Sequence, residues 1–160
     1  MELITQHKAT HSLTLNINRG MNIDNVKRLF GKICYSVDQD RFSKKRVDRI
    51  VSSFRFSAIA FIEHADSHPH LHAAVNLSPS WLGGFVDDSY VCRLEAHWLR
   101  ITKDSGSIQL DPIFCDAGWG RYITKSMRRD DEFLLSTDFH PSDSLIQSSD
   151  LRMVLEQLAP

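Results

Sequence analysis

The architecture of this chain is most clearly indicated by residues 54–77, which read FRFSAIAFIEHADSHPHLHAAVNL. Two apolar runs, residues 54–64 and 70–77, alternate in the manner of β-strands, whose successive side chains point to opposite faces. A short polar loop, residues 66–69 (DSHP), separates the two runs. The stretch therefore predicts an antiparallel hairpin at the centre of the chain.

The two faces of this hairpin differ in chemistry. Because alternate residues of a strand share a face, His70 and His72 project from one side of the second strand, while Leu71 and Ala73 point into the core. In the first strand one face is the apolar row Phe56, Ala58, Ala60 and Ile62, and the other face carries Arg55, Ser57, Ile59, Phe61 and, at its end, Glu63.

Two imidazoles and a carboxylate on one face predict a site for a divalent metal ion. The hairpin brings Glu63 close to His70 and His72, and such a set, with open positions for water and substrate, suits a catalytic Mn²⁺ or Mg²⁺. A His-x-His pair alone also occurs often by chance. His64 is an alternative third ligand, although strand parity assigns it to the core row, and His68 is expected in the loop.

Upstream, residues 12–18 predict a half-buried strand. Leu13, Leu15 and Ile17 form its apolar face, and its polar face carries Thr14, Asn16 and Asn18 as candidate DNA contacts. An amphipathic helix follows, with Asn22 or Asp24 as its cap and a helical repeat of apolar residues at Val26, Leu29, Phe30 and Ile33.

The remaining pattern predicts one or two helical turns near residues 47–51, a helix over 87–99 and a strand near 108–114. A helix is expected over 122–129, and the last third is expected to be irregular until a short helix near 151–158. The hairpin makes at least part of the sheet antiparallel, so this order of elements predicts an α+β layer sandwich. A length of 160 residues is typical of one domain, 1–160, with a core of about residues 10–130 and a C-terminal tail, 131–160.

The composition favours a protein of the cytoplasm. The three cysteines are far apart in the sequence, which argues against a disulfide framework, and neither a signal peptide nor a membrane span is expected. The formal net charge is only −1, less basic than is usual for a DNA-binding protein. The positive residues are nevertheless clustered, in residues 44–49 and 121–129, either as DNA contacts or as solvated helix faces.

A second candidate group lies in the predicted helix over residues 122–129. Tyr122 and Lys125 are spaced i, i+3, so they share a helix face. The phenol of a tyrosine is a weak nucleophile near neutral pH, and a nearby cation or a metal-polarised phosphate makes it useful. Arg121 and Arg128 extend the positive charge and are candidate DNA contacts. The common alternative for Tyr-x-x-Lys is a half-buried core tyrosine.

Taken together, these motifs resemble the HUH endonuclease superfamily, and within it the rolling-circle replication initiators. The resemblance covers about the first 130 residues and rests on three motifs in order: the strand Leu13–Asn16, the His-hydrophobic-His strand His70–His72, and the helix with Tyr122–Lys125. Glu63 matches the carboxylate that often completes the family's metal site. A single tyrosine candidate, and no nucleotide-binding loop of a helicase, are departures from some members.

The resemblance implies an HUH-like fold, with a central antiparallel β-sheet and flanking helices related to RNA-recognition folds. It also implies a nicking and joining reaction on single-stranded DNA or a DNA hairpin at a replication origin. Tyr122 would form a 5′-phosphotyrosine and free a 3′-hydroxyl, helped by Lys125 and by an ion on His70, His72 and Glu63. The free 3′-hydroxyl would initiate rolling-circle replication or transfer, with host helicase and polymerase as partners.

Two other functions fit parts of the sequence. Residues 68–75 loosely resemble the histidine-triad nucleotide hydrolases, although Pro69 fits that pattern badly. A non-catalytic nucleic-acid-binding module on the same fold is the second alternative. Trp81 or Trp119 could stack on a base, or could be a core tryptophan.

Overall fold

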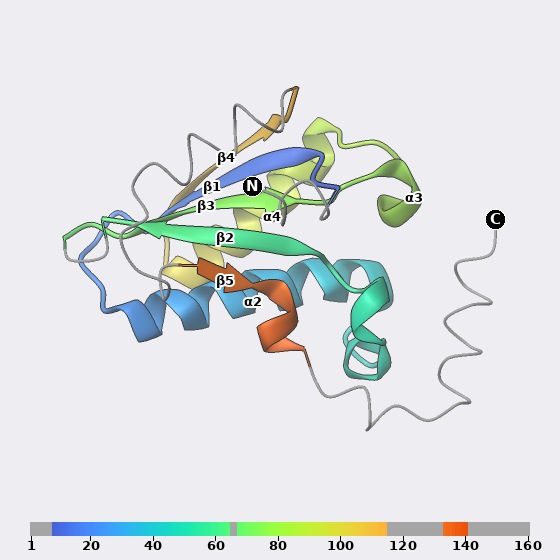
Figure 1. The fold of residues 1–160 in the computed structure, drawn as a ribbon, viewed down its shortest axis with the longest axis horizontal. Helices are drawn as coiled ribbons and strands as arrows, with labels where there is room; N and C mark the ends of the chain where they lie inside the picture. The colour runs from blue at the N-terminus through green and yellow to red at the C-terminus, as the bar shows by residue number, and fades with distance from the viewer. Residues whose placement is uncertain (1–7, 65–66, 115–132, 141–160) are drawn as a thin grey trace.

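The structure is a computed structural model that describes residues 8–64, 67–114 and 133–140. At its centre lies a five-stranded antiparallel sheet in the order β4-β1-β3-β2-β5 (Figure 1). The strands are β1 (His11–Asn16), β2 (Ala58–Glu63), β3 (His70–Val75), β4 (Ser107–Pro112) and β5 (Phe133–Leu135). The predicted α+β class with a central antiparallel sheet is confirmed.

Two helices, α2 (Ile23–Phe42) and α4 (Asp88–Thr102), pack on the same side of this sheet, the far side in Figure 1. Asn22 caps α2, because its side chain accepts a hydrogen bond from the Asn25 N–H at 2.9 Å. Asp87 caps α4 in the same way. The shorter helices are η1 (Val47–Arg49), η2 (Ser52–Phe54), α3 (Pro79–Leu82) and η4 (Ser136–Phe139). None of the helices in these described ranges has the length and apolar composition of a membrane span.

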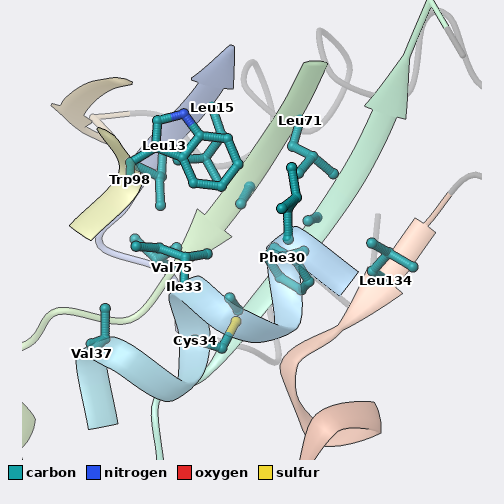
Figure 2. Packing of buried hydrophobic residues seen from close by; sticks show 14 of the residues in the cluster. Leu13, Leu15, Phe30, Ile33, Cys34, Val37, Leu71, Val75, Trp98 and Leu134 are labelled. Carbon is teal, nitrogen blue, oxygen red and sulfur yellow. The ribbon is translucent and has the colours of Figure 1, made fainter. Parts of the chain in front are cut away.

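The hydrophobic core lies between the two helices and one face of the sheet (Figure 2). The strands contribute alternate residues such as Leu13, Leu15 and Leu71, as the period of two requires. Among the described residues, the largest fully buried side chain is that of Trp98 in α4, whose indole N–H donates to the Asn16 carbonyl at 2.9 Å. This bond ties α4 to the end of β1, so the core also positions the strand beside the predicted metal ligands.

The start of β2 differs from the sequence prediction, which placed Arg55 on the outward face of a strand. The strand begins only at Ala58, and Arg55 is 2% exposed. Its Nε donates to Asp38 of α2 at 2.8 Å, and the Phe56 N–H donates to the same carboxylate at 2.6 Å. Burial raises the pKa of Asp38, and Arg55 opposes that shift. The pair needs both partners, because an unpaired buried charge is strongly destabilising.

A second difference concerns the C-terminal region, which was expected to be irregular up to residue 150. Residues 133–135 form β5, which pairs with β2 at the edge of the sheet and buries Leu134 in the main core. The helical turns expected near residues 47–51 are the single turn η1. The helices predicted over residues 122–129 and 151–158 lie outside the described residues.

Gly106 provides a test of the packing between α4 and the sheet. A β-carbon at this position would lie 2.5 Å from Trp98 Nε1 and 2.7 Å from Thr102 Oγ1, which is closer than packed atoms tolerate. We expect Gly106→Ala to lower the free energy of unfolding by about 1–3 kcal/mol, because overpacking forces the neighbours apart. Urea denaturation measures this change. Gly84→Ala is the control, because open space surrounds Gly84; equal losses for the two variants would contradict the packing described here.

Candidate metal centre

The candidate metal centre lies at the turn end of the β2–β3 hairpin, where Glu63 ends β2 and His70 begins β3. The antiparallel register places Glu63 directly opposite His70, and His72 stands two residues further along β3 on the same face. One Glu63 oxygen, Oε2, lies 3.2 Å from His70 Nε2 and 3.3 Å from His72 Nε2. The predicted grouping of these three side chains is confirmed, and it arises from the register of one hairpin.

The donor atoms fit a single divalent ion. One donor atom from each of Glu63, His70 and His72 lies within 4.8 Å of the other two. Two ligands at right angles around an ion held at about 2.1 Å lie about 3 Å apart, which agrees with the two Glu–His separations. Two imidazoles and a carboxylate also serve Fe²⁺ or Zn²⁺ in other proteins. The geometry therefore indicates a divalent cation site without selecting the metal.

Hydrogen bonds behind the imidazoles hold their rings in place. Thr14 of β1 is the register partner of His72, and its hydroxyl lies 3.1 Å from His72 Nδ1. On His70, Nδ1 lies 3.4 Å from the His68 carbonyl. When each Nδ1–H donates to these oxygens, each Nε2 keeps its lone pair for an ion. The predicted strand residue Thr14 thus supports a ligand of the site rather than only lining the surface.

The site is partly shielded from solvent and remains accessible to a ligand. The side chains of Glu63, His70 and His72 retain 15%, 22% and 13% of their exposure. Burial lowers the pKa of His72, and the nearby Glu63 carboxylate opposes that shift. A lowered pKa keeps His72 neutral near pH 7, which is the state that binds a metal. The arrangement can therefore hold a cation and still leave positions for a substrate oxygen.

His64 does not lie where strand parity predicted it. Parity assigned His64 to the buried row, but β2 ends at Glu63 and His64 has a φ of 52°, in the left-handed region. This backbone turn breaks the alternation, so His64 is exposed and its ring centroid lies 5.2 Å from that of His70. His64 is therefore a neighbour of the site on the solvent side. His68 is an exposed loop residue, as predicted.

The sheet face around the site has a polar half and an apolar half. On the polar side Asn16 is the register partner of His70, and its amide donates to Ser107 of β4 at 3.3 Å. On the apolar side Phe61 is paired with both His72 and Phe133 of β5. Phe133 remains 40% exposed. Sequence patterns did not indicate Phe133 as a surface aromatic, because a strand of three residues is too short to display a period of two.

Several other predicted contacts lie elsewhere or beyond the described ranges. Asn18 has left the strand, with a φ of 57°. Trp81 packs against the core, and its indole N–H donates to the Phe54 carbonyl, so the core interpretation of Trp81 is confirmed. The remaining predicted positions, namely Trp119, Arg121, Tyr122, Lys125 and Arg128, lie outside the described residues.

Comparisons with protein-family models, with curated proteins and with solved structures give no match for this chain. The resemblance to HUH endonucleases consequently rests on the three sequence motifs. The antiparallel sheet and the grouping of Glu63, His70 and His72 are compatible with it.

The hydrogen bond from β1 to His72 generates a prediction about ion binding. We expect Thr14→Val, which keeps the side-chain shape but removes the hydroxyl, to weaken Mn²⁺ binding about 10–100-fold, as is usual for the loss of a group that orients a metal ligand. Calorimetric titration of the folded protein measures the affinity. Ser12→Ala is the matched control, since the Ser12 hydroxyl on the same strand donates to the Asp111 carbonyl instead. Equal affinities for Thr14→Val and the wild type would contradict an orienting role.

Proposed function

We propose that this protein is a metal-dependent endonuclease and strand transferase that nicks and rejoins single-stranded DNA through a tyrosine, and thereby initiates rolling-circle replication or transfer. The observation that carries the proposal is the convergence of Glu63, His70 and His72 on the sheet face that α2 and α4 leave free. Part of this face is buried, with Ile59, Phe61 and Ala74 in a small second cluster, but the three ligands keep enough exposure for an extended strand to reach them. The resemblance to HUH endonucleases supplies the reaction.

Each chemical role is proposed for particular residues of the chain. Glu63, His70 and His72 would hold the ion, and we propose Mn²⁺ or Mg²⁺ because both accept phosphate oxygens alongside protein ligands. The bound ion would supply a Lewis acid for the scissile phosphate. Thr14 keeps His72 in the orientation that this role needs.

Tyr122 is the proposed nucleophile. Its phenol oxygen would form a bond to phosphorus while the bond from phosphorus to the 3′ oxygen breaks. The phenol proton is lost, and the released 3′ oxygen becomes a hydroxyl that a host polymerase can extend. Lys125 would stabilise the negative charge that develops. Reversal by a 3′-hydroxyl would reseal a strand, so no nucleotide cofactor is needed.

The positions of the other tyrosines favour Tyr122. The chain has three tyrosines. Tyr35 on α2 and Tyr90 on α4 belong to the helices that cover the opposite face of the sheet from the metal centre. Burial raises the pKa of both phenols, and a nearby aspartate adds to the shift in each. Neither is a suitable nucleophile for a phosphate bound at His70 and His72.

The surroundings of the metal centre also suit an unstacked DNA strand. Asn16, a predicted DNA contact, borders the centre on the polar side, and Phe133 offers an exposed ring on the apolar side. Bases of a single strand stack on such rings, whereas a duplex hides its bases. Arg121 and Arg128 are the further proposed phosphate contacts. Cys34 and Cys92 are free thiols, which suits the proposed cytoplasmic location.

The test is incubation with a pool of single-stranded DNA and Mn²⁺, followed by mass spectrometry of covalent protein–DNA adducts. We expect adducts at Tyr122 that disappear in EDTA and in the double variant His70→Ala, His72→Ala. His68→Ala is the matched control, because His68 is an exposed loop residue. Normal cleavage by the double variant would refute the metal assignment.

Variants of the tyrosine motif separate the proposal from its alternatives. Tyr122→Phe keeps the ring and removes the attacking oxygen, so it should bind metal and DNA but form no adduct, while Lys125→Ala should only slow the reaction. A nucleotide linked to His70 would indicate a histidine-triad-like hydrolase. Metal and DNA binding without any adduct would indicate a non-catalytic module. An adduct at Tyr35 or Tyr90 would keep the reaction class but overturn the choice of nucleophile.

Phe133 generates a further prediction. Loss of one base-stacking ring typically costs about 1–3 kcal/mol of single-strand binding, or roughly 5–150-fold in affinity. We therefore expect Phe133→Ala to weaken binding of a single-stranded oligonucleotide by this amount in a fluorescence anisotropy titration. Phe85→Ala is the control, because Phe85 is an equally large side chain, 83% exposed, in the loop between α3 and α4. Unchanged affinity for Phe133→Ala would exclude base stacking at β5.

A further inference from the structure

A basic groove runs along the helical layer, on the other side of the molecule from the metal centre. It is a depression of about 840 Å³ bounded by α2 and the C-terminal end of α4, and we call it the α2–α4 groove. Its charged lining residues are Asp24, Lys27, Arg28, Lys32, Arg100 and Lys103. Five cations thus face a single carboxylate, in a chain whose formal net charge is −1.

The charge of this groove depends on whether its cations are paired. None of the five forms an ion pair with a carboxylate of the described residues. Arg28 donates to the Asn25 side-chain amide oxygen, and Arg100 contacts His97 Nδ1. Like charges gathered from two helices repel one another, and a polyanion in the groove would relieve that repulsion. The groove is therefore complementary to a negatively charged partner.

The size and lining of the groove indicate an extended anion. The α2 residues that line it run from Asp24 to Ser36, about 18 Å of helix at 1.5 Å per residue. Tyr35 also lines the groove, with its hydroxyl donating to Asp48 at 3.3 Å. A positive track beside an aromatic ring is the usual surface for single-stranded nucleic acid. A single small anion would leave most of these charges without a partner.

We propose that the α2–α4 groove binds the phosphodiester backbone of single-stranded DNA as a second site, separate from the metal centre. The choice of DNA over another polyanion rests on the proposed function. Because the sheet lies between the groove and the metal centre, a long strand would contact both faces by passing around the molecule. The groove would hold DNA next to the nicked segment and contribute affinity that does not depend on the metal.

The test measures the salt dependence of binding, in EDTA so that no cleavage occurs. The probe is a fluorescein-labelled single strand of about 30 nucleotides, longer than the ~4–16 nucleotides that one binding face covers. Each phosphate contact contributes about −0.7 to the slope of log affinity against log salt. The triple variant Arg28→Gln, Lys32→Gln, Lys103→Gln should therefore have a slope less steep by about 2. All three side chains are exposed, so the fold should persist, and circular dichroism checks this.

We assign the basic cluster at residues 44–49 to solvent and the DNA contacts to the groove, so the matched control is Lys44→Gln, Lys45→Gln, Arg46→Gln. It also removes two lysines and one arginine, all exposed, but from the turn before η1. A less steep dependence of log affinity on log salt in the groove variant alone supports the proposal. Equal changes in both variants, no change in either, or wild-type protein that does not bind the probe would overturn it. Competition by polyglutamate as effective as by DNA would also overturn it, in favour of an acidic polypeptide.

The two proposals fail in different ways. The double variant His70→Ala, His72→Ala should bind the probe in EDTA with the wild-type slope, because its groove is unaltered. If DNA is never cut but the binding of the groove variant still depends less steeply on salt, the nuclease proposal fails and the groove proposal stands. If adducts form normally but the groove variant has the wild-type slope, only the groove proposal fails.

Discussion

The arrangement of this protein depends on the register of the central strand β3. Residues of β3 pair with β1 on one side and with β2 on the other, so its alternation sets which side chains face the core across three strands. A slip of one residue would turn His70 and His72 into the core and expose Leu71. The apolar face of β3 is fully buried, and its burial therefore determines where the polar face holds its metal donors.

Features that follow from local periodicity could be predicted from the sequence. The hairpin, the inward Leu71 and Ala73, and the meeting of Glu63 with His70 and His72 all follow from a period of two and a short turn. The helices α2 and α4 follow from a helical apolar repeat, and of the two predicted caps for α2 it is Asn22 that caps it.

Features that depend on a break in the period or on distant partners could not be predicted. His64 leaves the strand pattern because its backbone enters the left-handed region. Arg55 is buried because Asp38, on another element, neutralises it. The strand β5 is too short to show a pattern, and it forms because the edge of β2 is available for pairing. For Arg55 and for β5 the determining partner is distant in the sequence. For His64 the determining feature is a backbone conformation that strand alternation does not predict.

The net charge of the chain also differs from the local charge at the surface of the folded protein. A net charge of −1 argues against a nucleic-acid-binding protein. In the folded chain, however, side chains from two helices bring positive charge together at one surface, the α2–α4 groove. Net charge sums over all residues and carries no information about which of them become neighbours. The local field that a ligand meets is set by the packing of α2 against α4.

The metal donors have one more consequence, because all three lie within residues 63–72. Ligands this close in sequence form a loop that costs little entropy to close, so the site can assemble as soon as the hairpin does. An ion that binds only the folded hairpin would stabilise the whole domain, by about 2.7 kcal/mol at one hundred times its dissociation constant. The availability of the ion would then influence how long the folded chain persists, quite apart from any reaction it supports.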